Sequence, residues 1–134
     1  MVRRLFTHAV QLVVAFMLGF VAMWVKFHES SSRLSAATHQ LNLATAQGAL
    51  TSAVVDVQRG YYELAREAIS SFFSSLRAET DSGATSILSP AQRVAVQPLF
   101  DRRDEIITLL ARSDPASLAQ LSDLYVSYRA IMNP

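Results

Sequence analysis

The feature that most constrains this chain is an apolar stretch near its N-terminus, AVQLVVAFMLGFVAMWV, from Ala9 to Val25. Gln11 is the strongly polar side chain within it. Extended at both ends to residues 5–27, the stretch matches the roughly 20 residues that a helix needs to cross a hydrocarbon core about 30 Å thick. Because lipid offers the backbone no hydrogen-bond partners, an isolated crossing segment must be helical. The sequence therefore predicts one transmembrane helix over residues 5–27.

Residues that favour a membrane boundary flank this stretch. Two arginines lie in the preceding tail, residues 1–4, and Trp24 and Lys26 lie at the far end. A short basic tail usually stays in the cytoplasm, whereas a long domain is translocated whatever its charge. We therefore expect a single-pass protein of a cell membrane, as in the bacterial inner membrane. Its tail would be cytoplasmic, and residues 28–134 would form a periplasmic or otherwise extracytoplasmic domain.

A cleaved signal peptide is the competing interpretation, because Ser35, Ala36 and Ala37 resemble a cleavage site. Two features favour a retained anchor instead. The apolar stretch exceeds the roughly 7 to 15 residues of a signal peptide's hydrophobic region. In addition, charged residues that include Lys26 and Arg33 separate the stretch from the cleavage-like site.

Composition argues against several classes of function. Three of the twelve lysines and arginines precede His28, so the rest of the chain carries nine basic residues against eleven acidic ones and a net charge of −2. This charge argues against a nucleic-acid-binding surface. The chain has no cysteine, which excludes disulfides, thiol catalysis and cysteine metal sites. Motifs of nucleotide-binding, metalloprotease and serine-hydrolase sites are also missing from the sequence, so we expect no enzymatic activity, cofactor or metal.

Beyond the apolar stretch, the sequence predicts helices only. A helix over 34–59 is indicated by apolar residues that recur at spacings of three and four, and Gly60 should end it. A second helix is expected over 61–79, and the polar, glycine-containing segment 80–88 favours a loop. The apolar stripes of these two helices are as follows: Leu43, Ala46, Leu50, Val54 and Val57 on the first, and Tyr61, Ala65, Ala68, Ile69, Phe72, Phe73 and Leu76 on the second.

Two more helices complete the predicted domain. The run SPAQ at 89–92 combines a serine cap, a proline at the first helical position and a glutamine that can complete a capping box. The helix that starts there should run over 90–112 with a kink near Pro98, which cannot donate to the helical ladder. Asp114 and Pro115 repeat the cap signal before a helix over 115–132. Short connections imply antiparallel neighbours, so we expect an all-α domain of about four helices in hairpins or a bundle.

One segment resembles a known family. The run GYYELA, residues 60–65, is similar to the centre of a tetratricopeptide hairpin, Gly-x-Tyr-x-x-Ala, and Ala53 matches the small residue of that motif's first helix. Residues 89–132 show no second copy, and such repeats normally stack in threes or more. The resemblance implies a local helical hairpin and protein binding. Three residues depart from the usual aromatic, tyrosine and proline of the repeat: Ala49, Asp56 and Arg77.

The three histidines are the first residues to test for chemistry. His8 could ligate a tetrapyrrole or bond to a neighbouring subunit, but a histidine near the end of a membrane helix is more simply explained by its nearness to the headgroups. His28 and His39 lie about three helical turns apart, so one metal ion on one helix cannot bind both. We expect these two side chains to be exposed to solvent.

Partner contact is the function that individual residues favour most. Ala15 and Gly19 have the small-xxx-small spacing that would allow the apolar helix to pack closely against another helix, including that of a second copy. Aromatic residues at the edge of the core are favoured as binding anchors. The full set of candidate partner-binding residues is Ala15, Gly19, Trp24, Tyr61, Tyr62, Phe73, Tyr125 and Tyr128.

These features support two hypotheses about function. The first is a non-enzymatic, membrane-anchored interaction protein: an accessory, assembly or stabilising subunit of a larger membrane complex. Its partners would be the lipid bilayer and other membrane subunits, and no nucleic acid. The alternative is a freestanding envelope sensor or ligand-binding module, in which the helices hold a small molecule between them.

Overall fold

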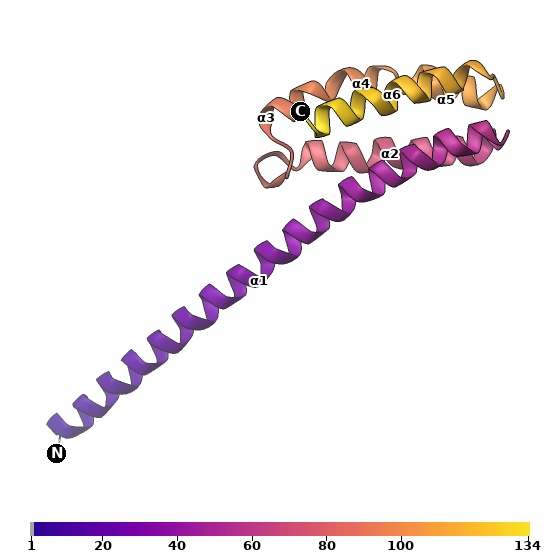
Figure 1. The fold of residues 1–134 in the computed structure, drawn as a ribbon. Coiled ribbons are helices and arrows are strands. Elements are labelled where there is room, and N and C mark those ends of the chain that lie inside the picture. The colour runs from indigo at the N-terminus through magenta and orange to yellow at the C-terminus, as the bar shows by residue number, and fades with distance from the viewer. Residues whose placement is uncertain (1) are drawn as a thin grey trace. The chain divides into compact units, whose positions relative to one another are not determined.

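The computed structural model describes residues 2–134, and every regular element in that range is a helix (Figure 1). The prediction of an all-α chain is therefore confirmed. The chain divides into two compact units, residues 1–37 and residues 38–134. Backbone structure is described throughout the range 2–134, whereas side chains are not described at the following positions: 2–7, 9, 25 and 27–32.

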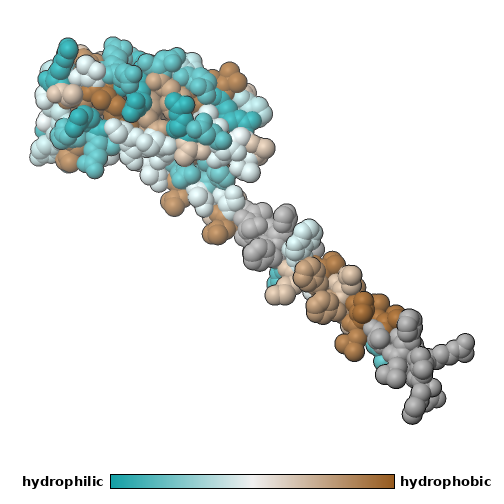
Figure 2. Space-filling view, turned by 180° about the vertical axis from the view of Figure 1, so that it is seen from behind, coloured by the Kyte–Doolittle hydropathy of each residue, from teal (hydrophilic) through white to brown (hydrophobic). Residues whose placement is uncertain are grey.

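Helix α1, Val2–Gln58, supplies the first unit and the first helix of the second unit. Between Val10 and Trp24 its large apolar side chains are exposed, and Figure 2 shows hydrophobic residues gathered along this part of the chain. In the part of the chain that the structure describes, no helix is both long enough and apolar enough to cross a membrane. Several side chains of the predicted crossing over 5–27 are not described, so the predicted segment lies partly outside the residues to which this finding applies.

The second unit is built from two helical hairpins. In Figure 1 the end of α1 lies beside α2, and a run of three short helices lies beside α6. Helix α2 packs against α5, and α5 packs against α6. The bounds are α2 Tyr62–Asp81, a 3-10 turn η1 at Gly83–Thr85, α3 Pro90–Ala95, α4 Gln97–Asp101, α5 Arg103–Ala111 and α6 Ala116–Met132.

The two hairpins share one apolar core, and the predicted stripes of α1 and α2 supply about half of its buried residues. Phe72 of α2 lies at its centre, edge-to-face with Tyr128 of α6 at 5.4 Å between ring centroids and with Phe73 at 5.0 Å. Tyr61 is an exception to the predicted stripe, because its side chain is 55% exposed at the hairpin turn. The buried apolar residues are Ala46, Leu50, Ala53, Val57, Ala65, Ile69, Phe72, Phe73, Leu76, Leu88, Val96, Leu99, Ile106, Leu110, Leu121, Leu124 and Tyr128.

Gly60 ends α1, as the sequence predicts. Its φ of 81° is a left-handed conformation that residues with a Cβ rarely adopt. The Gly60 amide donates to the Val57 carbonyl at 3.0 Å, and the Tyr61 amide donates to the Asp56 carbonyl at 2.8 Å. This pair of bonds is a Schellman motif, which satisfies carbonyls that the helix leaves unpaired at its end.

The capping box at the start of α3 is also confirmed. The Gln92 amide donates to the Ser89 hydroxyl at 3.1 Å, and the Ser89 amide donates to the Gln92 side chain at 2.9 Å. Ahead of Pro98 the helix breaks at Val96, where the sequence predicts a kink. The chain breaks a second time at Arg102, which the sequence analysis did not predict.

The second break coincides with contacts across to α6. The Arg102 guanidinium donates to the Gln120 side chain at 3.1 Å and lies 3.8 Å from the Asp123 carboxylate. Helix α5 ends at Ala111, and Ser113, two residues later, has a left-handed φ of 54° although it is not glycine. The Asp114 carboxylate accepts the Ala116 amide at 2.9 Å, but α6 begins at Ala116 with Pro115 in the capping position, one residue later than the sequence predicts.

Candidate functional site

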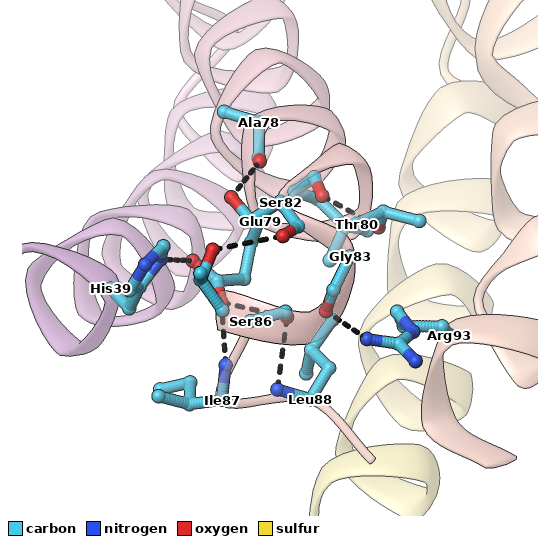
Figure 3. A network of polar contacts seen from close by, with 12 residues as sticks. His39, Ala78, Glu79, Thr80, Ser82, Gly83, Ser86, Ile87, Leu88 and Arg93 are labelled. Carbon is cyan, nitrogen blue, oxygen red and sulfur yellow. Dashed lines mark hydrogen bonds and ion pairs between the residues drawn. The ribbon is translucent and has the colours of Figure 1, made fainter. Parts of the chain in front are cut away.

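Glu79, near the end of α2, is a fully buried carboxylate that joins three segments of the second unit (Figure 3). Its Oε2 accepts a hydrogen bond from His39 Nδ1 of α1 at 2.8 Å. Its Oε1 accepts the Ser86 hydroxyl at 2.8 Å and the Ile87 amide at 2.9 Å. The carboxylate therefore links α1 and α2 to the segment that follows η1.

The hydrogen bonds to Glu79 determine its ionisation. Burial by itself raises the pKa of this carboxyl, but the hydrogen bonds from Ser86, His39 and Ile87 together outweigh burial and hold the pKa below the ordinary 4.5. The group is therefore an ionised acceptor at neutral pH. Since an ionised carboxylate can only accept, His39 Nδ1 must carry the hydrogen in this bond.

Further hydrogen bonds fix the segment that the sequence predicts as a loop. The Leu88 amide donates to the Ser86 hydroxyl at 3.1 Å, and the Thr85 hydroxyl donates to the Ser82 carbonyl at 2.8 Å. Arg93 of α3 donates to the Gly83 carbonyl (Figure 3). We call His39, Glu79, Ser86 and Ile87 the Glu79 cluster.

The Glu79 cluster links segments of the fold and does not have the geometry of a catalytic triad. In a catalytic triad the serine hydroxyl donates to the histidine, which the carboxylate orients. Here Ser86 donates to the carboxylate itself, so His39 is not placed to activate it. Among the residues that the structure describes, no group of three or more histidines, aspartates and glutamates could hold a metal ion.

The expectation of a solvent-exposed His39 is wrong. Its side chain is only 12% exposed because it pairs with Glu79, forty residues further along the chain. Helical spacing within α1 carries no information about that partner. The predicted exposure of His28 lies outside the described side chains, and His8 is exposed on α1.

The candidate partner-binding residues fall into two groups. Phe73 and Tyr128 are buried and pack against Phe72 in the core, so they are not available to a partner at the surface. Burial also raises the pKa of Tyr128. The others keep exposed surface: Ala15, Gly19, Trp24 and Tyr61 are exposed, whereas Tyr62 and Tyr125 are half-buried.

A second apolar stripe on α1, which the sequence analysis missed, lies at the surface of the second unit. Its members recur at alternating spacings of three and four, and all are exposed: Leu41, Ala44, Gly48, Thr51 and Val55. We call these five residues the α1 stripe. The sequence analysis assigned only the buried stripe of this helix, because that stripe contains the bulkier residues.

A groove between α1 and α6 borders the α1 stripe. Its volume is about 300 Å³, and Thr51 and Val55 of the stripe line it from α1. Its other lining residues are Val54, Gln58, Ser122, Tyr125 and Val126. A second hollow of about 330 Å³ is lined by Ala44 of the stripe, by Tyr128 of α6, and by Ile87, Leu88 and Gln92 from the segment after η1 and from α3. Both hollows therefore touch the stripe.

No protein-family model, curated protein or solved structure matches the chain. The likeness to a tetratricopeptide hairpin thus stays a prediction drawn from the sequence. Locally, α1 and α2 do form a hairpin at Gly60, with Ala53 and Ala65 both fully buried where small residues allow close approach. Tyr62 packs against the core from the start of α2.

Proposed function

We propose that this chain is a non-enzymatic, membrane-anchored interaction protein that serves as an accessory, assembly or stabilising subunit of a larger membrane complex. The observation that carries the proposal is the exposure of large apolar side chains around α1 between Val10 and Trp24. A helix that is apolar on most of its circumference is typically found inside a large protein or inside a membrane. The described large apolar side chains in this range are all 49% exposed or more.

The arrangement of small residues on this part of α1 supports docking against another helix. At about 100° per residue, Ala15 and Gly19 share a narrow face with Ala22 and the polar Gln11. The bulky residues occupy the remaining circumference. Small residues allow close helix packing in lipid, and a glutamine can hydrogen-bond across the contact. The bulky side would then face the lipid.

The second unit supports an interaction role more than a ligand-binding role. Phe72 and Tyr128 fill the centre between its helices, where a bundle that binds a small molecule would keep a cavity. The carboxylate of Glu79 is used within the fold. By contrast, Tyr61 and Leu64 remain exposed beside the hairpin turn, where a partner could contact them.

The test is purification of the full chain from its native membrane in mild detergent, followed by mass spectrometry of the proteins that co-elute. The proposal expects a reproducible set of membrane subunits in fixed proportion. Recovery of the chain without detergent in the soluble fraction would refute the anchor. Recovery from the membrane with no companion in fixed proportion would refute the subunit role.

A matched pair of variants tests the small face. Gly19→Leu adds bulk where Ala15 and Gly19 would meet another helix, and Val13→Leu adds bulk on the opposite side of the same helix. We expect Gly19→Leu to lose most of the co-eluting subunits, whereas Val13→Leu keeps them. Equal retention by both variants would contradict docking through this face.

A further inference from the structure

The α1 stripe has the spacing of a coiled-coil seam. Leu41, Gly48 and Val55 are seven residues apart, and Ala44 and Thr51 fall between them at the second seam position. The side chains of the stripe are exposed, although the neighbouring face of the same helix is in the core. Leu41 is 65% exposed. One face of this segment of α1 therefore packs in the core of the second unit. The second face, with coiled-coil spacing, is not covered by any described residue.

The segment of α1 that carries the stripe has no charged residue. No aspartate, glutamate, lysine or arginine lies between Leu41 and Val55, and the exposed residues beside the seam include Gln40, Thr45 and Gln47. A solvent-facing helix surface normally carries charged residues. An uncharged seam can meet an identical seam without placing like charges opposite each other or burying an unpaired charge.

Gly48, at the middle of the stripe, is unusual for its position. It lies inside a helix, where glycine is less favourable than alanine because it loses more conformational freedom on folding. A Cβ at position 48 would meet nothing within 4 Å, so the domain's own packing does not require glycine there. Close approach of another helix backbone is a reason for glycine at the middle of the stripe.

We infer that the α1 stripe is a self-association surface whose partner is the α1 stripe of a second copy of this chain. The parallel direction of the pair rests on the proposed membrane anchor, because two anchors in one membrane point the same way. In a parallel pair each residue faces its own counterpart, so Leu41 packs on Leu41 and Gly48 on Gly48.

The size of the surface suits a dimer at the lower end of stability. From Leu41 to Gln58 the helix is roughly 26 Å long, at about 1.5 Å per residue. With flanks about 10 Å wide and the groove beside α6, the contact would bury roughly 500 Å² on each copy. The total of about 1,000 Å² is below the roughly 1,200 Å² of stable specific interfaces and is typical of a weak, reversible dimer. Val126, 65% exposed at the groove, extends the apolar surface onto α6.

The absence of cysteine allows a direct test on the full chain in mild detergent. Single-cysteine variants Ala44→Cys and Thr45→Cys place a thiol on the seam and one residue beside it, at positions that are both exposed, and both variants keep Gly48. Under mild oxidation we expect Ala44→Cys to form a disulfide-linked dimer at least ten times faster than Thr45→Cys. Equal rates, or no dimer at position 44, would overturn the inference.

Charge substitutions test the partner and the direction. We expect Leu41→Glu to halve the molar mass measured by light scattering, because two carboxylates would face each other in the seam. Val94→Glu makes the same change at another exposed apolar side chain, 72% exposed on α3, and should keep the dimer mass. Mixing Leu41→Glu with Leu41→Lys should restore the dimer. A dimer that survives Leu41→Glu, or fails to return on mixing, would overturn the parallel self-association.

These results are separable from the test of the proposed function. A cross-link from position 44 to a different subunit would overturn self-association and leave the subunit role in place. A homodimer that purifies without companions would support self-association and refute the subunit role. A wild-type chain with a monomer's mass would overturn the inference whatever else co-elutes.

Discussion

Replacing Glu79 should cost more stability than replacing any exposed carboxylate of the chain. Its carboxylate accepts hydrogen bonds from His39, Ser86 and Ile87, and the variant Glu79→Ala would leave all of these donors without an acceptor. A hydrogen bond to a charged group contributes about 1.5–3 kcal/mol. Water can reach the partly exposed Ser86 in the variant. We therefore expect the free energy of unfolding to fall by about 3 kcal/mol, which is less than the sum over the three hydrogen bonds.

Glu79→Gln should cost less, about 1–2 kcal/mol, because the amide oxygen can still accept from Ser86 and Ile87. It also removes a titration. The unfolded chain binds a proton at Glu79 at higher pH than the folded chain does, since the folded pKa is lowered. The stability from this group is fully present above the ordinary pKa of 4.5 and declines as pH falls through the lower folded pKa. Glu79→Gln should therefore show a weaker acid dependence than the wild type.

The assay is urea unfolding of the full chain in mild detergent, followed by far-UV circular dichroism at neutral pH and through an acid series. Hydrogen exchange at the Ile87 amide adds a local readout, and exchange should be faster in both variants because that amide donates to Glu79. Glu67→Gln, an exposed carboxylate on the same helix, is the matched control. The reasoning is refuted if Glu67→Gln and Glu79→Gln shift the unfolding midpoint equally, or if exchange at Ile87 is unchanged.

Three further predictions concern helix ends, all measured by the same urea unfolding. Gly60→Ala should lose about 1–2 kcal/mol, because a Cβ is strained at a φ of 81°; an unchanged midpoint would contradict this. Ser113→Gly should gain up to about 1 kcal/mol by relieving a left-handed φ of 54°, and a lower midpoint would show that serine is not strained there. Ser89→Ala removes the hydroxyl acceptor of the capping box and should cost about 1 kcal/mol, whereas Ser89→Asp, which keeps an acceptor, should cost little.

The sequence predicted the structural features that depend on residues close together in the chain. Gly60, the Ser89 capping box and the break ahead of Pro98 act through neighbours within one helical turn, and each does what the local rules predict. The buried stripes of α1 and α2 follow in the same way from helical spacing. Tyr61 departs because the hairpin turn, and not the helix, sets its direction.

The Glu79 cluster could not be predicted in this way. Glu79 and His39 lie forty residues apart, and each alone resembles an ordinary polar residue on a helix. Only the packing of α2 on α1 brings them within 2.8 Å and buries the carboxylate. The segment after η1 completes the cluster because its backbone turns the Ile87 amide toward the same carboxylate.

The sequence by itself determined that the chain is helical and where several helices begin or end, because those features depend on contacts within a few residues. It did not decide whether the helices predicted over 5–27 and 34–59 are joined, and α1 is continuous over Val2–Gln58. Tertiary structure decided which side chains of each helix are left at the surface. From helical spacing, Tyr128 and Phe73 could be either surface anchors or core residues. Their packing against Phe72 places both in the core. The α1 stripe is exposed because the other apolar face of the same helix packs in the core. One helix can carry two apolar stripes, and helical spacing does not determine which of them the fold buries.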